Sequence, residues 1–284
     1  EQCMQVLDGI AAFAKPIIIL TGGEPMLRGD VYDIAARADA LGMRVAMATC
    51  GAMLDGESAR RAKAAGISVV SVSLDGATPE SHDAFRGVEG AFESALGGIE
   101  AARGAGLAFQ VNTTVTRDNV GELEAILDRS VALGARTFNP FLLVPTGRGE
   151  QLADREMSAE QYEKTLRRLA SQCARDDINI RVTCAPHYQR IIRQMGLPAA
   201  GPHDSAGCMG GKSFAFISHT GVVRICGFLD VPAGDLVQEG LDFRRVWDSS
   251  ELFARVRNVP GYHGKCGRCD YSSVCGGCRA RAYA

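Results

Sequence analysis

Four cysteines near the end of the chain have a spacing that suits iron–sulfur chemistry. Cys266, Cys269, Cys275 and Cys278 form the pattern Cys-x2-Cys-x5-Cys-x2-Cys. A structural zinc site more often separates two cysteine pairs by roughly 12 to 20 residues. The shorter gap brings four thiolates together on a short loop, which fits a 4Fe–4S cluster or parts of two clusters. Zinc and disulfides are the alternatives that this pattern leaves open.

Three earlier cysteines are candidates to bind metal with this cluster. Cys208 and Cys226 flank a segment that predicts a hairpin, and four residues separate Gly221 from Cys226. Cys184 is a candidate to join them, although each cysteine taken singly also fits a small buried apolar residue. The other cysteines are assigned to that simpler class: Cys3, Cys50 and Cys173.

A glycine-rich turn near the start of the chain is the second candidate site. The run Gly22-Gly23-Glu24-Pro25 follows an apolar segment and precedes a helical one. Two glycines let the backbone approach a ligand, and the proline fixes the exit from the turn. The carboxylate of Glu24 could receive an ammonium group. The alternative is a strand-end turn whose acid only caps the next helix.

Polar residues also follow other apolar segments. Ser73 and Asp75 end one such segment, and Asn112 and Thr114 share one face of the next by the two-residue period of a strand. Polar side chains that converge at the carboxyl ends of strands can bind a small polar ligand. Ordinary capping of the following helices is the alternative.

The elements that would position these residues alternate between strands and helices. The predicted strands are 17–21, 44–49, 68–74, 109–115 and 137–144, and the predicted helices are 3–14, 31–41, 55–65, 92–104 and 120–133. This alternation predicts parallel βαβ units in an α/β fold, either a partial barrel or an open doubly wound sheet. Glycines at the helix ends are typical C-terminal caps: Gly42, Gly66, Gly106 and Gly134.

The pattern changes after Pro145. We expect a helix over 158–174 with a capping box between Ser158 and Gln161, and a linker over 198–211. A hairpin over 214–226 would turn at Thr220–Gly221, and a helix is expected over 243–256.

Composition narrows the class of protein. The 284 residues carry a net charge of −2, which gives no basic field for nucleic acid. No apolar run approaches the roughly 20 residues that span a bilayer, so no membrane partner is expected. We expect a cytoplasmic location, where thiols are kept reduced, so clustered cysteines in such a chain indicate metal before disulfide. Residue 1 is Glu within a predicted helix and the end has no stop signal, so we expect both ends to be cut edges of a longer protein.

Together these motifs resemble the radical S-adenosylmethionine (SAM) enzymes with a SPASM or twitch extension. The glycine-rich turn looks like the motif that recognises the methionine amine, and the late cysteines resemble an extension that holds auxiliary 4Fe–4S clusters. The resemblance implies a partial (β/α)6 TIM-like barrel lacking its first strand over 1–183, and a cysteine-rich auxiliary iron–sulfur domain over 184–284. The extension usually has three residues in its last cysteine gap, whereas this chain has two.

A closer resemblance is to the haem-biosynthesis branch, the AhbD/NirJ type. Its members trim propionate or acetate side chains from iron tetrapyrroles, which implies a tetrapyrrole substrate. The resemblance does not clearly distinguish these enzymes from SPASM peptide maturases, which are therefore one alternative. A non-catalytic iron–sulfur or zinc scaffold is a further alternative. The runs that carry it are Ser73-Leu-Asp-Gly76, His82-Asp-Ala-Phe-Arg-Gly87, Asn112-Thr-Thr-Val-Thr116, Leu143-Val-Pro-Thr-Gly-Arg-Gly149, Cys184-Ala-Pro-His-Tyr188 and Cys275-Gly-Gly-Cys-Arg-Ala-Arg-Ala-Tyr283.

The resemblance assigns roles to named residues. Gly22, Gly23 and Glu24, with Pro25, would hold the methionine amine. Ser73, Asp75 and Arg86 are candidates for the carboxylate and ribose, and Asn112 and Thr114 would line the same chamber. The implied metal ligands are Cys184, Cys208, Cys226, Cys266, Cys269, Cys275 and Cys278. Arginines suit substrate carboxylates because the guanidinium fork donates two parallel hydrogen bonds, and the candidates are Arg148, Arg190, Arg279 and Arg281.

One departure from the superfamily pattern is serious. No three cysteines have the spacing Cys-x3-Cys-x2-Cys that binds the catalytic cluster, which the resemblance locates upstream of the first helix. We therefore expect this chain alone to be inactive. In the intact enzyme, a reductant such as flavodoxin or ferredoxin would allow formation of a 5′-deoxyadenosyl radical from SAM. Hydrogen loss from a propionate, followed by release of carbon dioxide, would leave a vinyl group and one electron for an auxiliary cluster.

Overall fold

The computed structural model describes residues 1–198 and 207–284, apart from the side chain of Arg148. Two compact units form: unit 1 comprises 1–140 and 176–181, and unit 2 comprises 141–175 and 182–284. The units differ from the predicted domains by grouping 141–175 with the cysteine-rich segment. The domain boundary between residues 183 and 184 stays a prediction.

A six-stranded parallel sheet forms the centre of unit 1, as the alternating pattern predicts. Its strands follow chain order, so β1 and β6 are the edges and the described residues form no closed barrel. The sixth strand is too short to stand out in the sequence. The strands are β1 (Ile17–Leu20), β2 (Arg44–Thr49), β3 (Ile67–Ser73), β4 (Ala108–Val115), β5 (Thr137–Leu142) and β6 (Asn179–Ile180).

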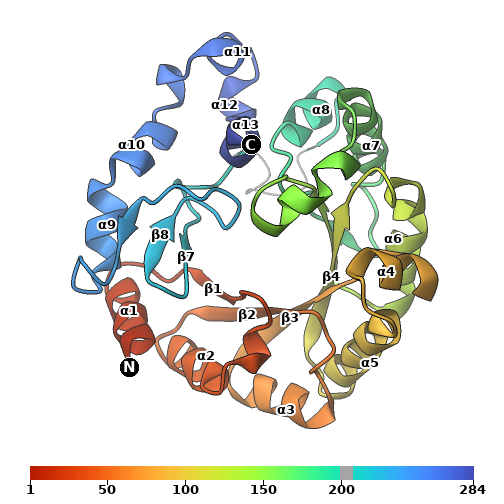
Figure 1. The fold of residues 1–284 in the computed structure, drawn as a ribbon, viewed down its shortest axis with the longest axis horizontal. Coiled ribbons are helices and arrows are strands. Elements are labelled where there is room, and N and C mark those ends of the chain that lie inside the picture. The colour runs from red at the N-terminus through yellow and green to blue at the C-terminus, as the bar shows by residue number, and fades with distance from the viewer. Residues whose placement is uncertain (199–206) are drawn as a thin grey trace. The chain divides into compact units, whose positions relative to one another are not determined.

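Helices along one face of this sheet are recognisable from their caps. Asp55 and Thr78 form capping boxes, and Gly42, Gly66 and Gly134 adopt positive φ where helices end. Figure 1 shows α2, α3, α5 and α6 along the outer face of the sheet. The helical segments of unit 1 are α1 (Gln2–Ala11), η1 (Pro25–Leu27), α2 (Val31–Ala40), α3 (Gly56–Ala64), α4 (Pro79–Arg86), α5 (Ala91–Gly104), η2 (Val120–Glu122) and α6 (Leu123–Leu133).

Helix α5 approaches the end of β2 closely at one glycine. An added Cβ at Gly98 would lie 2.5 Å from the carbonyl oxygen of Gly51, which itself has φ +90°. The preceding glycine of the helix, Gly97, is exposed, and an added Cβ there would meet nothing within 4 Å. Gly98 therefore sets how near α5 lies to the strand end that carries polar residues.

These two glycines form a matched pair for a stability test. We expect Gly98→Ala to lower the free energy of unfolding by about 1 to 3 kcal/mol, because the methyl group meets a backbone oxygen. Gly97→Ala should instead raise it by about 0.5 to 1 kcal/mol, since alanine favours an exposed helix. Urea unfolding followed by circular dichroism measures both changes. Equal effects of the two substitutions would contradict the close approach.

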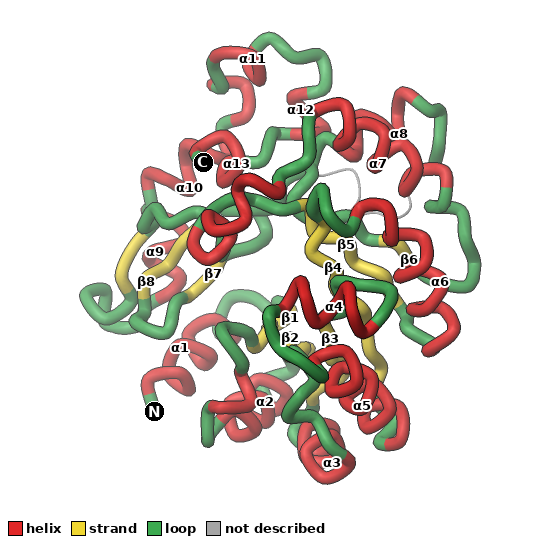
Figure 2. The backbone as a smooth tube through the Cα atoms, turned by 45° about the vertical axis from the view of Figure 1, so that its right-hand side comes forward, coloured by secondary structure: helices red, strands yellow, loops and turns green. Residues whose placement is uncertain are grey.

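Unit 2 contains a small antiparallel sheet and several short helices (Figure 2). Strands β7 (Phe216–Ile217) and β8 (Val222–Arg224) form the predicted hairpin, with Gly221 at φ +89° in the turn. Strand β9 (Gly234–Asp235) pairs with β8. The helical segments are η3 (Gly147–Arg155), α7 (Ala159–Ser171), α8 (Tyr188–Gln194), α9 (Phe243–Ser249), α10 (Glu251–Arg257), η4 (Val259–Gly261), α11 (Gly264–Gly267), α12 (Ser272–Cys275) and α13 (Arg279–Tyr283).

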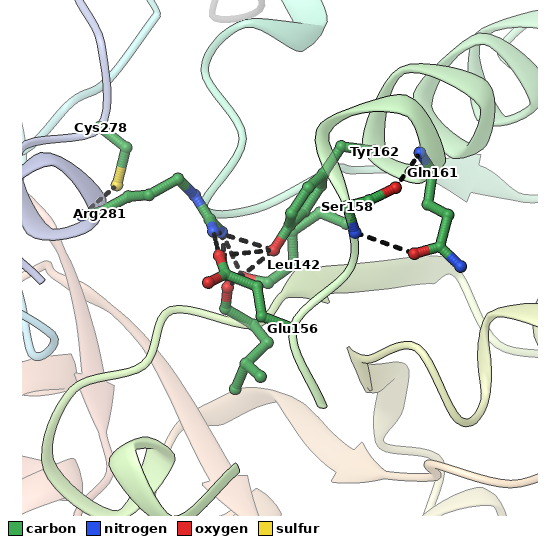
Figure 3. Close-up of polar contacts among 8 residues, drawn as sticks. Leu142, Glu156, Ser158, Gln161, Tyr162, Cys278 and Arg281 are labelled. Carbon is green, nitrogen blue, oxygen red and sulfur yellow. Dashed lines mark hydrogen bonds and ion pairs between the residues drawn. The ribbon is translucent and has the colours of Figure 1, made fainter. Parts of the chain in front are cut away.

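Two predictions for unit 2 have clear outcomes. The capping box is confirmed, because Ser158 and Gln161 exchange hydrogen bonds of 2.8 and 3.2 Å (Figure 3). The single helix over 243–256 is wrong: Ser250 has extended backbone and divides it into α9 and α10. The predicted linker over 198–211 lies largely outside the described residues. Among the residues described, no helix is long and apolar enough to cross a membrane.

Candidate functional site

The glycine-rich turn of unit 1 is organised by the carboxylate of Glu24. One oxygen accepts hydrogen bonds from the Thr49 hydroxyl at 2.9 Å and the Cys50 backbone N–H at 2.8 Å. The other accepts the Met26 N–H at 3.1 Å. These contacts join the end of β1 to the end of β2, so the acid that could have received an ammonium group instead shapes the turn.

The two glycines of the turn leave space and backbone oxygens for a ligand. A Cβ at Gly22 or Gly23 would meet no atom within 4 Å, and Gly22 has φ +148°, which side chains disfavour. Among the residues that the structure describes, no hydrogen bond reaches the carbonyl oxygen of either glycine. Carbonyl oxygens in this state can accept the hydrogens of an ammonium group.

Polar residues at the ends of β3 and β4 lie beside one another. Ser73 and Asn112 are register partners on adjacent strands, and both are half-buried. The Asn112 side chain accepts a hydrogen bond from Gln110 at 3.1 Å, as expected for two residues on one face. Thr114, also half-buried, follows on the same face. The strand ends therefore present a short row of polar groups.

Asp75 is buried behind this row and positions Arg86. Its carboxylate accepts the Thr114 N–H at 2.6 Å and forms an ion pair with Arg86. Asp75 has no exposed surface, whereas the Arg86 side chain is 32% exposed. The Asp75 oxygen in the ion pair has no hydrogen bond, so charge attraction dominates this contact. We therefore expect Arg86 to reach a ligand and Asp75 to hold it in place.

Sequence reasoning missed two side chains that support Asp75. His82 is 2% exposed, and its Nδ1 accepts the Asp75 N–H at 3.0 Å. Burial lowers the pKa of His82, which keeps the ring neutral and able to accept. Asn119 donates to the carbonyl oxygens of Asp75 and Thr114, both at 2.8 Å. A short polar residue soon after a strand end is the only local signal for Asn119.

Electrostatic interactions link the groups of this site. The Cys50 thiol, next to Glu24, is acted on by the charges of both Glu24 and Arg86, although burial is the main cause of its raised pKa. The ends of β1, β2 and β3 thus face one small region of unit 1. A hollow lined by residues such as Arg103 and Arg136 lies at the opposite ends of the strands and is not part of this site.

The seven candidate cysteines of unit 2 separate into two groups. The four-cysteine group is defined by mutual electrostatic interactions: Cys184 interacts with Cys208, Cys226 and Cys278, and Cys278 interacts with Cys208 and Cys226. Burial is the main cause of the raised pKa of Cys184, Cys226 and Cys278, and the neighbouring thiols add to it.

The three-cysteine group consists of Cys266, Cys269 and Cys275. Burial raises the pKa of Cys275, and the Cys266 and Cys269 thiols raise it further. Glycine keeps space beside one of these thiols, because a Cβ at Gly277 would lie 3.2 Å from Cys266 Sγ. The groups meet at the backbone, where the Cys208 N–H donates to the Cys275 carbonyl at 3.1 Å.

The described cysteine side chains are not arranged to hold one metal ion among three of them. Within residues 1–198 and 207–284, no three Cys, His, Asp or Glu side chains converge closely enough to hold one metal ion. A 4Fe–4S cluster needs its thiolates further apart, because each thiolate binds a different iron. The backbone of Cys184 is also unusual: φ is +62°, a left-handed conformation uncommon for a non-glycine residue. Strain of this kind is concentrated at functional sites.

The arginines predicted to bind substrate carboxylates have partners within unit 2. Arg190 forms an ion pair with Glu163, and Arg281 forms one with Glu156. Arg279 donates to a cysteine sulfur. The side chain of Arg148 lies outside the described residues. Substrate binding by these arginines stays a prediction.

Comparisons with known proteins identify the family of this chain. The model of the Radical SAM superfamily matches residues 1–130. An AdoMet-dependent heme synthase from Nitratidesulfovibrio vulgaris is 43% identical, with 100% of this chain and 79% of the relative covered. A protein of the same name from Methanosarcina barkeri is 42% identical, with coverage of 100% and 83%. The mycofactocin maturase of Mycolicibacterium smegmatis is 30% identical, with coverage of 100% and 71%.

A solved structure shows the same fold at low identity. Streptococcus suis SuiB bound to S-adenosylmethionine superposes with a TM-score of 0.75 at 14% identity. The likeness covers 99% of this chain and 66% of that one. It extends over both the strand-and-helix unit and the cysteine-rich unit.

Proposed function

Because this chain belongs to the radical SAM superfamily of enzymes, we propose that it acts in haem biosynthesis on the side chains of an iron tetrapyrrole. The reaction would be an oxidative decarboxylation or side-chain removal. The observation that carries the proposal is the 43% identity, over the whole chain, to a protein named AdoMet-dependent heme synthase. Identity to the mycofactocin maturase is lower, at 30%, and identity to SuiB bound to a precursor peptide is 15%, which favours a tetrapyrrole over a peptide.

SAM and 4Fe–4S clusters are the cofactors of this superfamily, and the residues present fit both. The open glycine turn and Arg86 suit the amine and carboxylate of SAM, and the cysteine groups suit the clusters. When bound, SAM and a reduced 4Fe–4S cluster supply a 5′-deoxyadenosyl radical that takes a hydrogen atom from the substrate.

The residues of unit 1 would bind and orient SAM. The carbonyl oxygens of Gly22 and Gly23 would accept hydrogen bonds from its ammonium group. Arg86 would donate to its carboxylate, and the buried Asp75 would keep the guanidinium oriented. The half-buried Asn112 would contact the ribose. Glu24 contributes by keeping the turn open rather than by touching SAM.

In unit 2, the four-cysteine group would hold one complete auxiliary cluster. The three-cysteine group would provide three thiolates for a second cluster. Cys269 is exposed, which leaves that cluster open toward solvent. Thiols in both groups require a reducing compartment, so we retain the cytoplasmic location and a flavodoxin or ferredoxin reductant as parts of this proposal.

A titration with iron coproporphyrin III tests the substrate class. Anaerobically reconstituted chain should give a saturable shift of the tetrapyrrole absorption band, and the tetramethyl ester should not, because it lacks carboxylates for the protein to bind. The same preparation should release no 5′-deoxyadenosine from SAM, since the sequence has no Cys-x3-Cys-x2-Cys. Didecarboxysirohaem tested in parallel distinguishes between tetrapyrroles.

The opposite results have clear meanings. An unchanged band with both tetrapyrroles, from protein that has bound iron, would contradict the tetrapyrrole proposal and favour a peptide substrate. Release of 5′-deoxyadenosine by these 284 residues would contradict the proposed inactivity of the isolated chain. Zinc in place of iron in anaerobically purified protein would overturn the assignment of the cysteine groups.

A further inference from the structure

Two arginines of α13 contact different cysteine groups. Arg279 Nη2 donates to Cys266 Sγ at 3.6 Å, within the three-cysteine group. Arg281 donates its backbone N–H to Cys278 Sγ at 3.4 Å, within the four-cysteine group (Figure 3). The Arg279 side chain and the Arg281 backbone, two positions apart on one short helix, therefore contact different groups, and the Arg281 bond is the N-cap bond of α13.

The guanidinium of Arg281 is held by a dense set of partners. Nη1 pairs with Glu156 and donates to the Tyr162 hydroxyl at 2.9 Å, and Nη2 donates to the Leu143 carbonyl at 2.6 Å (Figure 3). The guanidinium also stacks on the Tyr162 ring, 4.7 Å from its centroid. The partners lie 119 to 138 positions earlier in the chain. These contacts fasten the helix next to a candidate metal ligand.

Arg279 has a simpler environment. Its guanidinium lies over the Tyr262 ring, 4.5 Å from the centroid, and among the described residues it has no carboxylate partner. Tyr262 in turn interacts electrostatically with Cys208 and with Cys266, one cysteine from each group. Arg279 therefore places an uncompensated positive charge beside the three-cysteine group, whereas Glu156 partly balances the charge of Arg281.

Charge and hydrogen bonds at thiolates control iron–sulfur potentials. A reduced cluster carries one more negative charge than an oxidised one, so nearby positive charge and N–H···S bonds stabilise the reduced form. The charge of Arg281 acts on the thiols of both Cys184 and Cys278. It is therefore close enough to influence a cluster bound there.

We infer that Arg281 is a positioning residue that fixes the Cys278 ligand and raises the reduction potential of the cluster bound by the four-cysteine group. Arg279 has the corresponding role for the three-cysteine group. The inference rests on the proposed iron–sulfur function of both groups. It adds that one short helix adjusts two clusters separately.

Arg281→Gln and Arg279→Gln form a matched pair, because each removes one positive charge from the same helix. Arg281→Gln should lower the midpoint potential of the four-cysteine cluster and leave that of the three-cysteine cluster unchanged. Arg279→Gln should lower the potential of the three-cysteine cluster and leave that of the four-cysteine cluster unchanged. Potentiometric titration followed by electron paramagnetic resonance measures each potential. Recording the four-cysteine cluster in a Cys269→Ser background, and the other in Cys226→Ser, assigns each signal.

Glu156→Gln gives a test of opposite sign. It removes the negative charge that balances Arg281, so the potential of the four-cysteine cluster should rise. Arg281→Lys keeps the positive charge but loses the planar guanidinium fork. The potential of the four-cysteine cluster should therefore lie nearer the wild-type value in Arg281→Lys than in Arg281→Gln. A chelator should remove the four-cysteine cluster of Arg281→Lys several-fold faster than that of the wild-type chain, because Cys278 is held less firmly.

Two results with Arg281→Gln that binds iron normally would overturn the inference. The potentials of both clusters would shift by the same amount, or neither would shift. If Arg281→Gln fails to bind iron, Glu156→Gln provides the test. A Glu156→Gln variant whose four-cysteine cluster shows no rise in midpoint potential overturns the inference. Wild-type chain that binds no iron would instead refute the proposed function of the cysteine groups, so the two failures are distinguishable.

Discussion

Cys226→Ser is expected to weaken the cluster of the four-cysteine group, with loss of up to about four iron atoms per chain, while the iron of the three-cysteine group is unchanged. A serine hydroxyl is not deprotonated at neutral pH and binds iron more weakly than a thiolate, so the four-cysteine cluster would keep only three strong ligands. Cys269→Ser should remove the iron of the three-cysteine group and leave the iron of the four-cysteine group in place. Iron and acid-labile sulfide per chain, together with Mössbauer spectra, measure each share.

Cys3→Ser provides the matched control for these variants. Cys3 belongs to α1 of unit 1 and has no part in either cysteine group, so its substitution should leave the iron content unchanged. If Cys226→Ser and Cys269→Ser each removed all of the iron, the seven cysteines would form one site. The separation into two groups would then be incorrect.

Arg86→Ala is expected to lower the free energy of unfolding by about 3 kcal/mol, although Arg86 is partly exposed. The substitution leaves the carboxylate of Asp75, which has no exposed surface, without its cation. Asp75→Asn should cost less, about 1 to 2 kcal/mol, because Arg86 can turn toward water when its partner is lost. Denaturant unfolding of both variants gives the two values.

A double-mutant cycle shows whether the ion pair is the cause. The combined Asp75→Asn/Arg86→Ala variant should be destabilised by clearly less than the sum of the single changes, because it buries no unpaired charge. Arg103→Ala is the control, since its exposed pair with Glu100 should contribute less than about 1 kcal/mol. Strict additivity of the single variants would show that Asp75 does not depend on Arg86.

The elements predicted from sequence are those whose signals are local. Strands such as Arg44–Thr49 are runs of apolar residues bounded by glycines, and both the structure and the predicted range agree. Helix α4 is not predicted, although Thr78 and Ser81 form a capping box at its start and Gly87 ends it, because it is short and only His82 among its residues is buried. The two-residue β6 was missed because its pairing with β5 depends on tertiary structure.

The sequence predicts which kinds of residue form the candidate site, but it does not predict their burial, contacts or grouping. The sequence indicates polar groups at the strand ends, but the support of Asp75 by His82 and Asn119 depends on contacts across seven and forty-four positions. Spacing likewise could not assign the cysteines. Cys275 and Cys278 belong to one sequence motif, yet they join different groups because the chain turns at Gly276 and Gly277, both at positive φ.

The hydrogen bond from Cys208 to Cys275 has a consequence for how the protein matures. It connects the backbone of one cysteine group directly to that of the other. Iron that settles in either group immobilises its loop and thereby reduces the conformational entropy still to be lost when the other group is filled. We expect filling of either group to favour filling of the other, so chains carrying both clusters should be more frequent during maturation than independent filling would give.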